Sequence, residues 1–313
     1  MKKQKGAVNI TLKIILFIVL AAYSVSLLFP LAWGLLTSFK SSLDFDTLRN
    51  VLGLPDMEFS RDEVLKFSNY ASMFKDIRLA RSVSFFMGNT EITHNSINGL
   101  GGMIINSLVY ALGGAFLNTA VTMCVAYVCA KYKFKAAGII YALVLFSMAF
   151  SPAGIYPATI SLLRGLGIYD TWFGYFFMKF NFGGMYFLLF YSFYQMLSDT
   201  YIEAAQIDGA SQFRIMFSII IPLSATIFST IALLIFVQLW NDYQTPLLYM
   251  PTKPTLAFGI YFFTNKTTSG GFAERGEPGK IAMCMLLAVP IIIIFVFLKD
   301  KIMGNVTMGG IKG

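Results

Sequence analysis

Long apolar runs are the feature that most constrains this chain. A membrane helix needs roughly 20 mostly apolar residues to cross about 30 Å of hydrocarbon, and the 313-residue sequence holds several such runs. Hydrophobic residues make up 57% of the chain and charged residues 13%, about half the charged fraction of a soluble domain. So few charges cannot cover a water-exposed surface. The sequence predicts an all-α integral membrane protein and excludes a disordered chain or a secreted disulfide scaffold.

Six segments are predicted to cross the membrane. The first follows a cluster of lysines, and its apolar run exceeds the core of about 7–15 residues that is typical of a signal peptide, which favours a retained anchor. The six segments are 14–36, 104–130, 136–163, 182–197, 217–239 and 281–298.

The placement of basic residues predicts that both termini are cytoplasmic. With the N-terminus inside, the short cytoplasmic segments and termini hold eleven lysines and arginines, whereas the one short outer loop holds two, Arg164 and Lys179. Cytoplasmic loops carry such an excess. This topology accounts for the net charge of +8, and no basic run interleaved with exposed aromatics points to nucleic acid.

Four parts follow from this topology. They are a cytoplasmic N-terminus with the first span (1–36), a long extracytoplasmic loop (37–103), a membrane core (104–298) and a cytoplasmic tail (299–313). The outer loop is too long and too apolar for a mere linker. It is interpreted either as a plug packed over the helices or as a docking surface for an outside partner.

Motifs for an internal energy source or a catalytic centre are missing from the sequence. The nearest approach to a phosphate-binding P-loop, Gly279-Lys280, lacks the earlier glycine and the following Ser or Thr. His94 is the single histidine, and the three cysteines show no metal-binding spacing. The apolar cores hold essentially no acidic residue for a proton relay. We expect no cofactor or metal in this chain and no enzymatic activity, with energy supplied by a partner.

One segment between the fourth and fifth spans, 198–222, stands apart. The stretch ending at Ile207 is predicted to form one or two helical turns at the membrane surface, where Ala204 and Ala205 present a smooth face for another protein. Asp208-Gly209 supplies a turn, because glycine tolerates the positive φ that ends a helix. On these grounds alone, a plain helical connector is an equally good interpretation.

The segment resembles the EAA loop of binding-protein-dependent ABC importer permeases. The residues that carry this resemblance are Glu203-Ala204-Ala205, Gly209, Ile219 and Pro222, the last of which is expected to open or kink the next span. Similarity to the carbohydrate-uptake branch, and within it to the maltose-type subunit with the shorter N-terminus, is carried by Asn106-Ser107, Ala126-Tyr127, Lys131, Pro152, Leu166-Gly167-Ile168-Tyr169, Trp240-Asn241 and the ending Met308-Gly309-Gly310-Ile311-Lys312-Gly313. Two positions depart from the family pattern: Ser198 replaces a usual proline, and Thr200 replaces a common acidic residue that here lies one place earlier, at Asp199.

The resemblance implies a type I ABC importer permease fold in the bacterial plasma membrane. Its partners would be a second, homologous permease subunit, two cytoplasmic ATPase subunits that bind MgATP, an extracytoplasmic solute-binding protein and a carbohydrate substrate. Glu203 would accept a charge-assisted hydrogen bond from the ATPase. The resemblance assigns the coupling role to Glu203, Ala204, Ala205, Asp208, Gly209 and Pro222. It assigns a tail at the ATPase interface to Gly309, Gly310, Lys312 and Gly313.

Substrate contacts are sought among aromatic and amide side chains in the middle or at the outer ends of spans. Sugars are bound by aromatic faces together with amides and carbonyls. The candidates are Tyr156, Gln238, Trp240, Asn241 and Tyr243. An interfacial aromatic belt is the alternative interpretation for the ring-bearing residues.

The leading hypothesis is therefore half of an importer pore for a carbohydrate, in particular an oligosaccharide. The same architecture with a peptide or polyamine cargo remains open, as does a non-transporting scaffold that keeps an ATPase-docking loop. A secondary carrier is the remaining class.

Overall fold

The computed structural model describes residues 2–42, 44–45, 51–53, 67–87, 90–132, 134–149, 155–265 and 276–306. The chain separates into two compact units. One comprises Met1–Ile77 with Phe262–Val289, and the other comprises Arg78–Tyr261 with Pro290–Gly313. The second unit holds the positions discussed as functional below.

The longest helix of the first unit is α1 (Lys2–Ser38). Many of its exposed side chains are large and apolar. Its C-terminal end is held by α2 (Ser68–Asp76). The Asn69 amide donates to the Ser38 carbonyl at 2.9 Å, and the Tyr70 hydroxyl donates to the Ser38 Oγ at 2.7 Å. The first bond satisfies a backbone carbonyl that a helix end leaves without an intrahelical partner, and the second adds a contact to a Ser38 hydroxyl that already donates to the Leu35 carbonyl.

The second unit begins with an antiparallel hairpin of β1 (Arg78–Met87) and β2 (Thr90–Gly99), in register from Arg78 opposite Gly99 to Met87 opposite Thr90. One face is partly covered: Phe85 packs in a core cluster with Leu163, Tyr169 and Tyr249, while the residues of β2 are half-buried or exposed. The all-α prediction is wrong at this segment. Side chains in a strand point alternately to two faces of the hairpin. The apolar side chains of one face pack against residues that are far away in the sequence.

Helices make up the rest of the second unit. Their bounds are α3 (Leu100–Leu108), the π-helix η2 (Val109–Gly113), α4 (Gly114–Lys131), α5 (Lys135–Ala149), α6 (Ile155–Gly165), α7 (Trp172–Lys179), α8 (Met185–Met196), α9 (Thr200–Ile207), α10 (Gln212–Ile215), the π-helix η3 (Met216–Ile220), α11 (Ile221–Leu223), α12 (Ala225–Trp240) and α13 (Gln244–Tyr249), followed by α14 (Leu256–Asn265) and α15 (Gly276–Val306), which run across both units.

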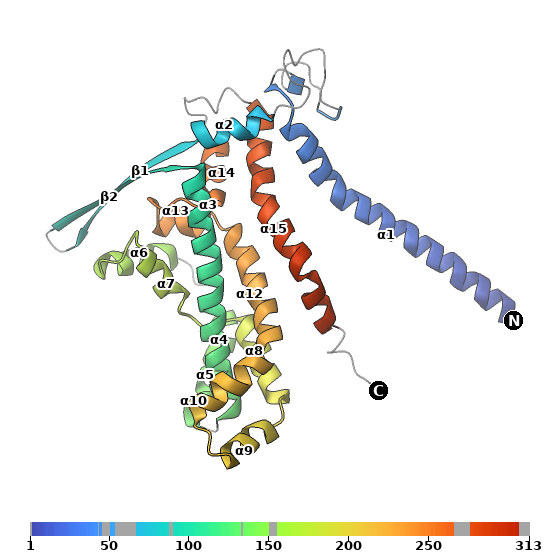
Figure 1. Ribbon diagram of the computed structural model, residues 1–313, viewed down its shortest axis with the longest axis vertical. Coiled ribbons are helices and arrows are strands. Elements are labelled where there is room, and N and C mark those ends of the chain that lie inside the picture. The colour runs from blue at the N-terminus through green and yellow to red at the C-terminus, as the bar shows by residue number, and fades with distance from the viewer. Residues whose placement is uncertain are drawn as a thin grey trace. The chain divides into compact units, whose positions relative to one another are not determined.

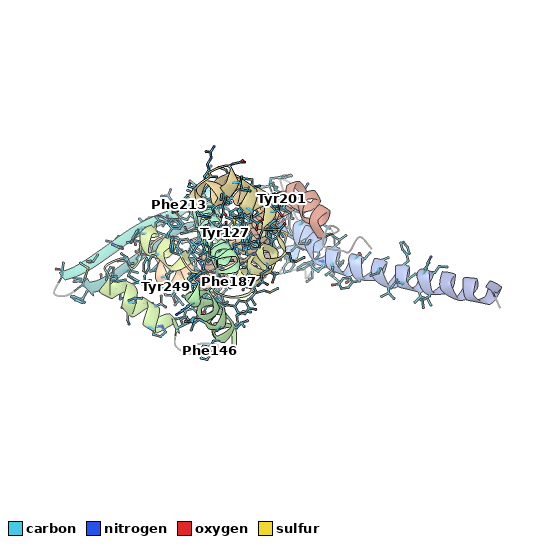
Figure 2. All side chains as sticks on the ribbon, turned by 90° about the horizontal axis from the view of Figure 1, so that it is seen from below. Tyr127, Phe146, Phe187, Tyr201, Phe213 and Tyr249 are labelled. Atoms are coloured by element: carbon cyan, nitrogen blue, oxygen red, sulfur yellow. The ribbon has the colours of Figure 1, made fainter. Side chains whose placement is uncertain are left out.

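α4 is the central helix of this unit, and it packs against α8 and α12. α9 and α10 lie at one end of the unit and the β1–β2 hairpin lies toward the other (Figure 1). Figure 2 shows Tyr127 and Phe187 among the crowded side chains in the middle of the body and Phe146 at its margin. Tyr127 is 2% exposed and Phe187 is fully buried, so aromatic packing around α4 forms the core.

Three described helices are long and apolar enough to cross a membrane: Leu12–Ser38, Leu100–Lys131 and Gly276–Ile294. A fourth span results if Gln212–Leu223 and Ala225–Trp240, bent by 71°, count as one. The six-span topology and the orientation of the termini stay predictions.

Two further expected spans also differ from a single helix of membrane-crossing length. The segment expected to cross at 136–163 contains α5 and α6, and Pro152 between them lies outside the described residues. The segment expected at 182–197 becomes helical only at Met185 and continues to Met196. α8 has 12 residues, about 18 Å of helix, which is too short to cross alone.

Candidate functional site

The surface helix predicted before Gly209 is present as α9. Glu203 and Ala204 are exposed on it, whereas Ala205 is 7% exposed and packs inward. One alanine of the pair therefore faces outward and the other anchors the helix. Two apolar side chains beside them are open to the surroundings: Ile207 is 86% exposed and Tyr201 is 50% exposed.

Gly209 ends α9 in the predicted way. Its φ is +76°, a left-handed conformation that favours glycine. The Ala210 N–H donates to the Ala205 carbonyl at 2.9 Å, and the Gly209 N–H donates to the Gln206 carbonyl at 3.0 Å. These two bonds form a Schellman motif, which satisfies carbonyls at the helix end. No atom would lie within 4 Å of a Cβ at Gly209, so backbone conformation and not space requires the glycine.

The bend expected near Pro222 is also present. Proline removes a backbone donor from the helix, and the helix axis turns by 71° between Leu223 and Ala225. At the turn, the Ser224 hydroxyl donates to the Ile220 carbonyl at 2.6 Å and lies 2.8 Å from the Tyr194 hydroxyl. Both oxygens are buried, so the bend is a packed and hydrogen-bonded element of the helical core.

The last residue of α4 contacts the entry to α9. Lys131 Nζ donates to the Leu197 carbonyl at 2.5 Å and lies 2.6 Å from Asp199 Oδ1. The next residue, Tyr132, donates its hydroxyl to Gln212 Oε1 at 2.7 Å. The sequence analysis used Lys131 as the end of a span and as part of the resemblance to the carbohydrate-uptake branch, but it did not predict this contact. The nearby acidic Asp199, out of its usual place, was the available signal for the ion pair.

A polar break lies between α7 and α8. Asn118 of α4 donates through Nδ2 to Asn181 Oδ1 at 2.6 Å, to the Asn181 carbonyl at 3.0 Å and to the Lys179 carbonyl at 3.3 Å. At about 1.5 Å of rise per residue, Asn118 is about 20 Å from the Lys131 end of its span. In the predicted six-span topology this places the break at the depth of the hydrocarbon core, where backbone groups need protein partners or water.

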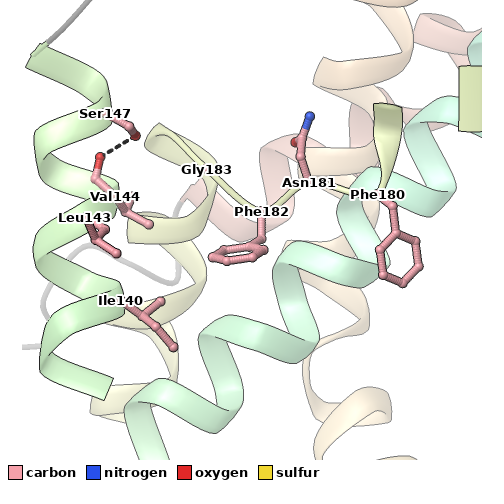
Figure 3. A pocket seen from close by; sticks show the side chains of 8 residues that line it. All are labelled: Ile140, Leu143, Val144, Ser147, Phe180, Asn181, Phe182 and Gly183. Atoms are coloured by element: carbon pink, nitrogen blue, oxygen red, sulfur yellow. Dashed lines mark hydrogen bonds between the residues drawn. The ribbon is translucent and has the colours of Figure 1, made fainter. Parts of the chain in front are cut away.

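A pocket of about 350 Å³ opens beside this break (Figure 3). Its walls are apolar and aromatic except for Ser147 and Asn181, and Ser147 Oγ is bonded to the Val144 carbonyl at 2.8 Å. Figure 3 shows α5 on one side and the extended segment before α8 on the other. The lining residues are Ile140, Leu143, Val144, Ser147, Phe180, Asn181, Phe182 and Gly183.

The predicted substrate residues fall in different environments. Gln238 is exposed on α12 and donates to the Tyr186 hydroxyl at 3.0 Å. Asn241 is exposed and bonds to the Val237 carbonyl of its own helix at 2.9 Å. Trp240 is 1% exposed and belongs to the packed core.

The two predicted tyrosines are partly exposed. Tyr243 is 40% exposed and stacks on Tyr261 with ring centroids 4.3 Å apart. Tyr156 is 42% exposed, and its ring centroid lies 6.4 Å from that of Tyr249. The structure does not bring the five predicted residues into one pocket among those found in the described part of the chain.

Asp170 connects its own segment to the strand β2 and to the segment at Thr252 and Lys253. It is fully buried, with Oδ1 accepting from the Thr252 N–H at 3.1 Å and Oδ2 accepting from Thr252 Oγ1 at 2.6 Å. His94 Nδ1 of β2 lies 2.9 Å from Oδ2, and Lys253 Nζ donates to the Asp170 carbonyl. Its φ of +58° is uncommon for a residue other than glycine. Nearby, burial raises the pKa of Tyr169, whose hydroxyl donates to the Leu248 carbonyl at 3.0 Å.

Replacement of Asp170 by alanine is expected to destabilise this end of the protein by about 2–3 kcal/mol, because it leaves buried donors of Thr252 unpaired and strains the backbone. The measurement is the thermal unfolding midpoint of the detergent-purified protein. Asp170→Asn, which tolerates the backbone and keeps an acceptor oxygen, is the matched control and should lose less. Equal midpoints for the wild type and Asp170→Ala would contradict the role.

The predicted tail contact and the expectation about metal ions concern residues that the structure describes only in part or not at all. The tail residues Gly309, Gly310, Lys312 and Gly313 lie outside them. Within the described ranges, no group of three or more His, Cys, Asp or Glu side chains is arranged to hold a metal ion.

Known proteins resemble the chain over most of its length. The diacetylchitobiose uptake system permease protein NgcG of Streptomyces coelicolor is 26% identical over 298 residues, which cover 93% of this chain and 86% of that protein. The arabinooligosaccharides transport system permease protein AraQ of Bacillus subtilis is 26% identical over 286 residues and 91% of both chains.

The fold has a counterpart among solved structures. A chain of a bacterial ABC transporter involved in the import of the acidic polysaccharide alginate superposes with a TM-score of 0.72, at 19% identity, covering 92% of this chain and 95% of that one. Residues 119–304, which include α9, the bend and the polar break, match the family described as binding-protein-dependent transport system inner membrane component. The chain belongs to this family of ABC importer permeases.

Proposed function

We propose that the chain is one of two homologous permease subunits of an ATP-driven, binding-protein-dependent importer for an oligosaccharide. The names of its relatives support this cargo: NgcG is a diacetylchitobiose permease and AraQ an arabinooligosaccharide permease. Two cytoplasmic ATPase subunits bind MgATP and an extracytoplasmic solute-binding protein delivers the sugar. This chain forms half of the pore and holds no cofactor of its own.

The proposed topology has six spans and two cytoplasmic termini. α7 and α8 together make one broken span, with residues 180–184 at membrane depth. The three bonds from Asn118 support this assignment, because non-helical backbone at that depth is tolerated only where protein or a water-filled cavity satisfies it.

The exposed surface of α9 carries the proposal. Glu203 and Ala204 are exposed beside Ile207, an apolar side chain at a helix end that gains nothing from contact with water. An acidic group beside exposed apolar side chains suits a protein partner that supplies a donor and an apolar cleft. We assign that surface, with the turn at Asp208 and Gly209 and the bend after Pro222, to the ATPase contact.

Two groups on the membrane part suit a hydroxylated cargo. Asn181 combines with the rings of Phe180 and Phe182 at the pocket, and Gln238 pairs with Tyr186 on the exposed surface. Amides and aromatic faces are the groups that bind sugars. Polar side chains at membrane depth face a bundle interior or a watery path, so these two groups are assigned to the translocation path.

Mass spectrometry of the proteins that co-purify with the tagged chain from its native membrane, in mild detergent, tests the proposal. We expect an ABC ATPase, a second permease and a solute-binding protein, and the binding protein can then be screened against a panel of oligosaccharides. Recovery of the chain alone, in a preparation where known membrane complexes survive, would overturn it. A peptide or polyamine as the preferred ligand would overturn only the cargo.

A further inference from the structure

Two neighbouring residues at the end of α4 hold both ends of one loop. Residues 197–212 leave α8, form α9 and enter α10. Lys131 contacts the loop where it begins, at Leu197 and Asp199, and Tyr132 contacts it where it ends, at Gln212. The backbone changes from helical to extended at Tyr132, with φ −99° and ψ 126°, which lets adjacent side chains reach separate targets.

The lysine side of the contact at the loop entry is withdrawn from water, whereas the aspartate side is open to it. The Lys131 side chain is 7% exposed, while that of Asp199 is 70% exposed. An ammonium group has three donors, and two of them bind the Leu197 carbonyl and the Asp199 carboxylate. A covered lysine that binds a backbone carbonyl as well as a carboxylate constrains the direction of the chain, which a solvent-exposed pair does poorly.

The role of Asp199 supports this interpretation. Asp199 occupies the N-cap position of α9, where an aspartate usually accepts a hydrogen bond from the first helical turn. It makes no such capping bond. Its carboxylate pairs with Lys131, and the Ser198 hydroxyl accepts the Thr200 N–H at 3.3 Å. Local capping by Asp199 is thus replaced by a tie to α4.

The exit contact is joined to the core of the helical body. The Tyr132 ring packs edge-on against Tyr127, with centroids 5.9 Å apart, and Tyr127 packs against Tyr194 at 5.4 Å. Tyr194 is the residue that bonds to Ser224 at the bend. The loop exit therefore rests on the same buried aromatic cluster as the bend between α11 and α12.

We propose that Lys131 and Tyr132 form a two-point clamp that makes the loop 197–212 and α4 move as one rigid body. A displacement of α9 is then delivered to the membrane-spanning α4 and is not absorbed by bending of the loop. Lys131 and Tyr132 are positioning residues in this scheme, which rests on the proposed role of α9 as the ATPase-docking helix. The contacts of Lys131 with Leu197 and Asp199 would also stiffen the entry to α9, which a proline in place of Ser198 would otherwise do.

Distances between two spin labels test the clamp in the complex with its co-purified partners. Cysteines at Gln206 on α9 and at Val128 on α4, both exposed positions, carry the labels after Cys124, Cys129 and Cys284 are replaced by alanine. Pulsed electron paramagnetic resonance then gives the distance distribution without nucleotide and after trapping with MgATP and orthovanadate.

We expect one narrow distribution that is the same in both states. Lys131→Ala should broaden it and make it shift on trapping, and Tyr132→Phe, which removes a single oxygen, should do the same to a smaller extent. Lys131→Arg keeps a donor group and should restore the wild-type distribution. Lys135→Ala, which removes the same charge at the exposed start of α5, is the matched control and should have no effect.

A Lys131→Ala distribution equal to that of the wild type would overturn the clamp, as would a wild-type distance that shifts on trapping. If Lys131→Ala does not reach the membrane, Tyr132→Phe carries the same test. Failure of the proposed function has a different signature. The wild-type chain would then recover no ATPase and show no response to MgATP and orthovanadate, while the nucleotide-free comparison of wild type and Lys131→Ala would still decide on the clamp.

Discussion

Replacement of Glu203 by lysine is expected to leave the chain in the membrane and to abolish both ligand-stimulated ATP hydrolysis and uptake. Glu203 is exposed in the first turn of α9, so the substitution disturbs no buried contact. It replaces an acceptor of charge-assisted hydrogen bonds by a cation, and like charges at a docking surface oppose association. The measurement is ATP hydrolysis and uptake by the reconstituted complex with its binding protein and the sugar found in the screen.

Two variants make this test specific. Glu203→Gln retains an acceptor oxygen and should keep part of the activity. Glu277→Lys reverses an exposed charge in the first turn of α15, and it should leave uptake near the wild-type level because surface charge pairs contribute little. Normal uptake by Glu203→Lys would contradict the coupling role.

Gly209→Asp should have the same effect for a different reason. A side chain has room at this position, but the left-handed backbone costs about 1–2 kcal/mol for residues other than glycine. A second carboxylate would also stand next to Asp208 at the C-terminal end of α9, where the helix dipole disfavours negative charge. Gly209→Asn has nearly the same shape and the same tolerance of the left-handed region but no charge, so the difference between the Asp and Asn variants measures the contribution of charge.

Replacement of Asn118 by leucine is expected to lower the stability of the protein by about 1–3 kcal/mol. Leucine has a similar volume but no donor, so the carbonyls of Lys179 and Asn181 and the Asn181 amide oxygen lose their contacts with Asn118. In the proposed topology these groups lie at membrane depth, where little water is available to replace Asn118 and an unpartnered polar group costs about 1–3 kcal/mol. The measurement is the thermal midpoint of the purified protein and the yield of monodisperse protein.

Ser229→Ala is the matched control for Asn118→Leu. Ser229 Oγ bonds to the Thr226 carbonyl within α12, so this variant also removes a side-chain hydrogen bond but leaves connections between helices intact. Its midpoint should stay near that of the wild type. Equal midpoints for Asn118→Leu and Ser229→Ala would show that the break between α7 and α8 does not depend on Asn118.

The parts of the site that are local in sequence were predictable. The helix ending at Ile207, the turn at Gly209 and the bend after Pro222 each depend on residues within about one helical turn, and backbone rules for glycine and proline act over that range. The structure confirms these three local conformations. The assignment of Glu203 and its neighbours to an ATPase contact remains a prediction.

The missed elements depend on features that hydropathy does not measure. Phe180 and Phe182 raise the hydropathy of the break to that of an apolar membrane helix. Asn181 between them accepts a hydrogen bond from Asn118 of α4, which hydropathy does not register. The β1–β2 hairpin has only part of each strand apolar, and the cover for Phe85 comes from Leu163 and Tyr249. A two-stranded hairpin is at best marginally stable alone, so its formation follows from that distant packing.

The buried carboxylate of Asp170 was hidden by distance along the chain. Its partners His94 and Thr252 are 76 and 82 positions away. Each partner in isolation looks like an ordinary loop or strand residue, and only the folded chain brings them together.

The ion pair between Lys131 and Asp199 has an evolutionary consequence. Residues in contact tend to change together in a family, so Lys131 and Asp199 are expected to be inherited as a pair among relatives that lack proline at the position of Ser198. Lineages that regain the proline acquire a stiff entry to α9 from the backbone itself, because its ring fixes φ. Selection on the acidic partner would then relax, and we expect Asp199 to vary in those lineages without loss of transport.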